Sequence, residues 1–62
     1  MEDYKMPNYE QWLDWLDKNN MYYRTEEYKS GVRDIIIGHG DYYHESVLEF
    51  DTDGNLYYIS TT

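Results

Sequence analysis

The chain has 62 residues and no cysteine. It contains thirteen Asp and Glu residues and five Lys and Arg residues, which gives a formal charge of −8. This composition excludes disulfides and thiolate metal sites, and it excludes ordinary nucleic-acid binding through Lys and Arg. It also disfavours attraction to anionic membranes. We expect a single domain over residues 1–62, intracellular and cytoplasmic because it lacks disulfides, with a basic protein as its partner.

One helix is predicted near the N-terminus. Asn8 is a good N-cap, and Gln11 three residues later completes a capping box after Pro7. The apolar stripe that follows has the i, i+3, i+4, i+7 spacing of one helix face: Tyr9, Trp12, Leu13 and Leu16. Asn19 and Asn20 predict the end of the helix, since Asn tolerates the left-handed conformation.

Four segments with strand character follow the helix. They are Tyr22–Tyr28, Val32–Ile37, Tyr42–Phe50 and Leu56–Thr61. Turn residues separate them at Ser30–Gly31, at Gly38–Asp41 and at Asp51–Asn55, where Gly54 supplies a positive φ. The fold class predicted is α+β: one N-terminal helix packed on an antiparallel three- or four-stranded meander sheet.

One helix covers one face of such a sheet and leaves the other open. In the third strand Ser46, Leu48 and Phe50 share one face, and the other holds Glu45, Val47 and Glu49. An open face of aromatic and acidic side chains is typical of an interaction surface, and a homodimer through this face is one form of it. The alternative is that the Tyr side chains shield the sheet.

Three constellations suggest chemistry but fit it poorly. Asp51–Asn55 resembles a calcium loop, yet its Gly is in the fourth position, so a hairpin turn is favoured. His39, Asp41 and His44 match no zinc spacing, and a solvated turn is favoured there. Carboxylate pairs need a cleft that so small a chain has little volume to build. We therefore expect no metal, no cofactor and no enzymatic activity.

The acids are clustered. One stripe on the helix consists of Glu10, Asp14 and Asp17, and a second cluster follows the third strand and its turn: Asp41, Glu45, Glu49, Asp51 and Asp53. Alternate residues of a strand are about 6.6 Å apart, close to the phosphate spacing along DNA. Mimicry of DNA and a solvated surface that keeps the protein soluble are both compatible with this pattern.

A short stretch adds a resemblance. Glu45-Ser46-Val47-Leu48 resembles the Glu-Ser-Ile-Leu stretch of uracil-DNA glycosylase inhibitors, and the match covers four residues of 62. The resemblance implies that Glu45 and Ser46 mimic phosphates from an accessible strand edge in the DNA groove of the enzyme. Val47 and Leu48 would be the apolar pair that follows. The meander, in contrast, predicts an inner position for this strand.

The sequence therefore predicts an acidic inhibitor that mimics DNA and blocks a host nucleic-acid-handling enzyme in a bacterial cytoplasm, with uracil-DNA glycosylase as the specific target. The alternatives are an anti-CRISPR-type nuclease inhibitor and a small homodimeric structural or assembly protein. The predicted partner-binding residues are Asp41, Glu45, Ser46, Val47, Leu48, Glu49, Asp51 and Asp53.

Overall fold

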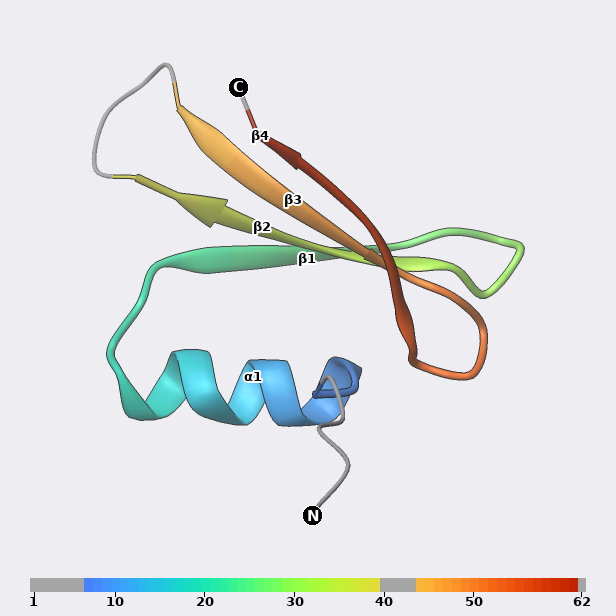
Figure 1. Cartoon of the computed structure of the whole chain (residues 1–62), viewed down its shortest axis with the longest axis horizontal. Helices are drawn as coiled ribbons and strands as arrows, with labels where there is room; N and C mark the ends of the chain where they lie inside the picture. The colour runs from blue at the N-terminus through green and yellow to red at the C-terminus, as the bar shows by residue number, and fades with distance from the viewer. Residues whose placement is uncertain (1–6, 40–43, 62) are drawn as a thin grey trace, which may run out of the picture.

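The computed structural model describes residues 7–39 and 44–61 and confirms the α+β meander (Figure 1). The elements are α1 (Tyr9–Lys18), β1 (Tyr23–Glu27), β2 (Arg33–Gly38), β3 (Glu45–Phe50) and β4 (Leu56–Thr61). The four strands pair in the order β1-β2-β3-β4, and each pair is antiparallel. Figure 1 shows α1 running along one side of the twisted sheet.

The helix begins and ends at the residues that the sequence predicts. The Asn8 side chain accepts a hydrogen bond from the Gln11 N–H, and the Gln11 side chain accepts one from the Asn8 N–H, both at 2.9 Å. This reciprocal pair is the predicted capping box. At the other end Asn19 is the C-cap, and Asn20 adopts a φ of 55°.

The core lies between α1 and one face of the sheet. Leu16, Ile35 and Phe50 have no exposed surface, and Leu48 completes the buried cluster. The rest of the predicted helix stripe, Tyr9, Trp12 and Leu13, packs against this cluster. The Tyr9 ring meets the Phe50 ring edge-on, with 5.3 Å between centroids.

Both ends of α1 are fixed to the sheet. At the start of the helix the Tyr9 N–H donates to the Gly54 carbonyl at 2.9 Å. At its end the Met21 N–H donates to the Leu16 carbonyl at 3.0 Å, and the Tyr23 hydroxyl donates to Asp17 at 2.7 Å. The bonds to Gly54 and from Tyr23 join the two ends of α1 to the turn between β3 and β4 and to β1.

The turn between β3 and β4 confirms the predicted hairpin. Asp51 Oδ1 accepts hydrogen bonds from the N–H groups of Asp53 and Asn55, each at 2.9 Å. Gly54 has a φ of 88° and donates its N–H to the Asp51 carbonyl. The carboxylate that a calcium loop would use is thus occupied by the turn itself.

The strand boundaries differ from the prediction by one residue at both ends of the first two strands, and they differ again at the start of the third. The first strand begins at Tyr23, because Tyr22 lies in the connection from α1 with 90% of its surface exposed. The third strand was predicted from residue 42, but β3 begins at Glu45, which pairs with Gly38 at the end of β2. Residues 42–43 lie outside the described residues. No helix within residues 7–39 and 44–61 is long and apolar enough to cross a bilayer.

The turn glycine provides a test of this fold. An Ala at position 54 would adopt a φ near 88°, while its Cβ would make only ordinary contacts, 3.5 Å from Arg33 Nη2. We expect Gly54→Ala to lower the free energy of unfolding by about 1–2 kcal/mol, the cost of a left-handed conformation for an L-residue. Urea unfolding followed by tryptophan fluorescence measures it.

Gly38→Ala is the matched control, since a Cβ there meets nothing within 4 Å and its φ is not positive. We expect its free energy of unfolding to stay within about 1 kcal/mol of the original chain. Equal losses in the two variants would contradict the role assigned to Gly54.

Candidate functional site

The face of the sheet opposite α1, which we call the outer face, carries three acids side by side. Glu26 of β1 pairs with Asp34 of β2, and Asp34 pairs with Glu49 of β3. Neighbouring strands are about 4.8 Å apart. We call these three side chains the carboxylate row. Like charges directly opposite each other destabilise a sheet, so the row opposes the stability of the isolated chain.

Two tyrosines donate hydrogen bonds to the carboxylate row. The Tyr28 hydroxyl donates to Asp34 Oδ2 at 2.7 Å and lies 3.2 Å from Glu26 Oε2. The Tyr57 hydroxyl donates to Glu49 Oε1 at 2.5 Å. The hydrogen bond to Asp34 raises the pKa of Tyr28 to about 12, and the bond to Glu49 raises the pKa of Tyr57 to about 12. A carboxylate acceptor stabilises the protonated phenol in each case.

The central acid of the row is buried and incompletely bonded. Asp34 is only 5% exposed. Its Oδ2 accepts from Tyr28, but its Oδ1 is buried and has no hydrogen-bond donor among residues 7–39 and 44–61. A buried carboxylate oxygen without a donor carries the full cost of its desolvation. The row is therefore a place where an added N–H donor or cation would be stabilised.

The next residues along the outer face are mixed in character. Arg24 forms an ion pair with Glu45, with 2.8 Å between Nη1 and Oε2. Between them Ile36 is 5% exposed and Val47 half-buried. A shallow hollow of about 210 Å³ opens at this end of the sheet, lined by Tyr22, Tyr23, Arg24, Ile36, Gly38 and Glu45. The outer face thus offers apolar contact beside the carboxylate row.

The motif Glu45-Ser46-Val47-Leu48 is divided between the two faces. Glu45 and Val47 lie on the outer face with Glu49, whereas Ser46 and Leu48 are on the side of α1. Ser46 pairs with residues on both neighbouring strands, Ile37 and Thr61, so it lies inside the sheet. Its Oγ is 2.7 Å from His39 Nε2. Leu48 is 5% exposed and belongs to the core.

The other predicted acids are scattered. Asp51 caps the turn between β3 and β4, and Asp53 projects from that turn, exposed to solvent. Asp41 lies outside the described residues. On the helix, Asp14 forms an ion pair with Lys18 at 3.0 Å, and Asp17 accepts from Tyr23. Of the predicted residues, the structure brings Glu45, Val47 and Glu49 together.

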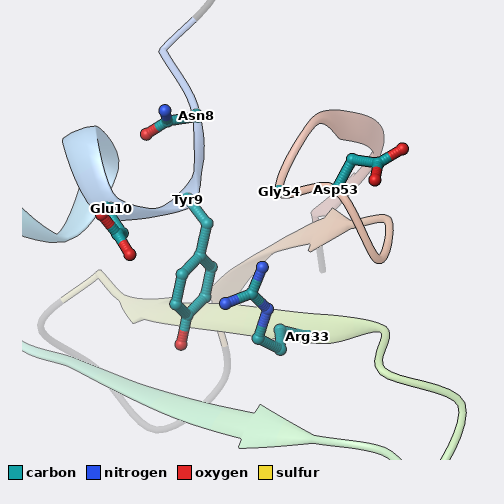
Figure 2. A pocket seen from close by; sticks show the side chains of 6 residues that line it. All are labelled: Asn8, Tyr9, Glu10, Arg33, Asp53 and Gly54. Carbon is teal, nitrogen blue, oxygen red and sulfur yellow. The ribbon is translucent and has the colours of Figure 1, made fainter.

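A second hollow lies where the start of α1 meets the turn between β3 and β4 (Figure 2). It has a volume of about 190 Å³ and is lined by Asn8, Tyr9, Glu10, Arg33, Asp53 and Gly54. Figure 2 shows the Arg33 side chain reaching toward the Tyr9 ring, with its Cζ 4.2 Å from the ring centroid. This cation–π contact joins β2 to α1, so Arg33 has a structural role here.

The sequence interpretation missed two members of the row, Glu26 and Asp34. Asp34 directly precedes the β-branched run Ile35–Ile37 within the same strand, and Asp is depleted in strands, which is itself a signal of a special position. The antiparallel registers of β1 with β2 and of β2 with β3 align it with Glu26 and Glu49. Alternation within one strand shows which residues share a face. It does not show which residues of neighbouring strands lie side by side, and the alignment of these three acids depends on that.

The described residues, 7–39 and 44–61, contain no group of three or more His, Cys, Asp or Glu side chains that could hold a metal ion. Comparisons of the chain with protein-family models, with curated proteins and with solved structures find no match. The function is therefore inferred from the site alone.

The two phenols predict a dependence of stability on pH. Their folded pKa values of about 12 exceed the ordinary value of 10.0, so their contribution is complete below pH 10 and is lost as the pH rises toward 12. We expect the loss of stability across this interval to be smaller in the double variant Tyr28→Phe/Tyr57→Phe than in the original chain. Urea unfolding at a series of pH values measures the difference.

Tyr22→Phe is the control, because Tyr22 is 90% exposed and forms no part of the row. We expect its pH profile to match that of the original chain. An unaltered profile in the double variant would show that these hydrogen bonds do not form in solution.

Proposed function

We propose that the chain is an acidic binding protein, not an enzyme, that occupies the basic groove of a nucleic-acid-handling enzyme and inhibits it. The observation that carries the proposal is the carboxylate row, whose central acid, Asp34, has a buried oxygen without a donor among the described residues. An Arg or Lys side chain of the partner supplies the opposite charge to the row through Glu26 and Glu49, which flank the buried Asp34.

The surroundings of the row suit a cationic side chain. Tyr28 and Tyr57 are 44% and 55% exposed, so their rings are available on either side of the row. Aromatic faces attract guanidinium and ammonium groups, and Tyr is enriched at protein interfaces. The shallow hollow lined by Ile36, and Val47, which pairs with Ile36, add apolar contact. These features combine a charged centre with an apolar margin.

The density of negative charge on one face of the sheet supports mimicry of DNA. Carboxylates lie about 4.8 Å apart across the strands, and Glu45 and Glu49 lie about 13 Å apart along β3, since each residue of a strand advances about 3.3 Å. A formal charge of −8 accelerates encounter with a basic groove. A rigid sheet presents these charges without the entropy cost of ordering a flexible chain.

Uracil-DNA glycosylase remains the specific target that we propose, in the cytoplasm of a bacterial host, with a CRISPR nuclease as the alternative. The division of Glu45 and Ser46 between two faces favours the carboxylate row, and not that pair, as the carrier of binding. Binding through the carboxylate row and binding through the Glu45-Ser46 pair predict that different substitutions weaken the complex, so the two can be distinguished.

The first test measures binding and inhibition of purified uracil-DNA glycosylase and of a purified CRISPR nuclease at near-physiological salt, with and without duplex DNA. We expect a stoichiometric complex that duplex DNA displaces. The double variant Glu26→Gln/Glu49→Gln should weaken it by about 1.5–3 kcal/mol for each charge-assisted hydrogen bond lost.

Glu10→Gln/Asp14→Asn is the matched control, because it removes two charges from the helix and leaves the row intact. We expect it to retain most of the affinity. Absence of binding to both enzymes would exclude these two targets. A complex that duplex DNA does not displace would exclude mimicry.

A second test separates the row from the motif. Ser46→Ala removes a hydroxyl on the side of α1, where it contacts His39. We expect its affinity for the target to be unchanged, and that of Asp34→Asn to fall, because the amide presents an N–H where the carboxylate has two acceptor oxygens. If Ser46→Ala loses as much as Asp34→Asn, the Glu45-Ser46 pair carries binding as in the resembling family.

A further inference from the structure

The two edges of the sheet differ in charge. The β1 edge carries Arg24, Glu26 and Glu27, and charged side chains of this kind protect an edge strand from pairing with another chain. The β4 edge, Leu56–Thr61, has no charged residue and no proline. An uncharged edge of aromatic and β-branched residues is a ready partner for a further strand.

The side chains of β4 are also left uncovered. Tyr57, Tyr58 and Ile59 are each more than half exposed. Ile59 pairs with Leu48 on the side of α1, yet Leu48 is buried and Ile59 is 54% exposed. Figure 1 shows that β4 begins near the start of α1 and runs away from it. The helix therefore does not cover the second half of this strand.

The charge of the chain indicates which strand fits this edge. A basic partner is complementary to the carboxylate row, and it gains nothing electrostatically from an uncharged strand. Two copies of a chain of charge −8 repel each other unless they meet at a neutral surface. Among the four strands of the described structure, β4 is the one without a charged residue.

We propose that β4 pairs antiparallel with β4 of a second copy of this chain, and that the two sheets join into one of eight strands. Antiparallel pairing about a twofold axis is self-complementary. With the axis at Ile59, Ile59 faces its own copy, Tyr58 faces Ser60, and Tyr57 faces Thr61. No like charges come into contact in this register.

This mode of pairing differs from a dimer through the outer face. In a face-to-face dimer the carboxylate row would meet a second carboxylate row, which repulsion opposes. A twofold axis perpendicular to the sheet instead keeps both rows on one side and both helices on the other. An eight-stranded sheet lies within the usual size range.

Sedimentation equilibrium of the purified chain at high micromolar concentration tests the proposal. We expect a dimer that persists at raised salt. Ile59→Lys should give a monomer, because it places two ammonium groups at the axis. Thr25→Lys is the matched control on the β1 edge, and it should remain a dimer. Circular dichroism establishes that each variant is folded.

Cross-linking locates the axis, and the absence of native cysteine makes it unambiguous. Single Cys substitutions at positions 57 to 60 are oxidised mildly. Residues that face each other across antiparallel strands lie within the distance that a disulfide requires. We expect rapid disulfide dimers at or next to position 59 and none from Thr25→Cys.

Three results would overturn the proposal. The first is a monomeric original chain at high micromolar concentration at both low and raised salt. The second is equal dissociation of Ile59→Lys and Thr25→Lys, and the third is cross-linking that is no faster at position 59 than at position 25. If the backbone N–H groups of β4 are protected from hydrogen exchange only in complex with another protein, the edge pairs with a strand of that protein and not with a second copy. Since this pairing leaves the outer face uncovered in either state, these results do not depend on the proposed inhibition.

Discussion

One helix of ten residues has to cover a sheet of four strands, and most of the molecule's character follows from this constraint. The apolar stripe of α1 reaches Ile35, Leu48 and Phe50, which form the core. Among residues 7–39 and 44–61, no helix covers the opposite face or the second half of β4. A chain that leaves so much of its sheet open derives stability from every contact at the ends of the helix, such as Tyr9 with Gly54.

The outer face illustrates how a fold holds an arrangement that is locally unfavourable. Three carboxylates side by side, one of them buried, destabilise the chain that contains them. The phenols of Tyr28 and Tyr57 offset part of this cost. Under the proposed function, a positive charge of the partner offsets the rest. The repulsion and desolvation of the three carboxylates destabilise the free chain. Relief of this destabilisation on binding would contribute to the affinity for the partner.

The local features of the fold were predictable, and the alignment of the site was not. The capping box at Asn8, the stop at Asn20 and the turn at Gly54 each depend on residues close in sequence, and the structure confirms all three. The alternation of Glu45 and Glu49 to one face also follows from the strand period.

The carboxylate row depends on pairing instead. Glu26, Asp34 and Glu49 come together through the registers of two hairpins, and a shift of one residue in either would separate them. Leu48 reads equally well as a partner-binding residue and as a core residue until the helix is placed above it. Its burial, and the division of Glu45 from Ser46, are consequences of tertiary packing.

The bond between Tyr9 and Gly54 has a consequence for the order of folding. The helix is the first element in the chain, but its start is held by the last turn and its stripe packs on Phe50. A ten-residue helix is marginal in water by itself. Stable docking of α1 therefore waits for the β3–β4 hairpin, and long-range closures of this kind slow the folding of a small domain. Until that contact forms, Trp12 and Leu13 remain exposed to solvent in the unfolded chain.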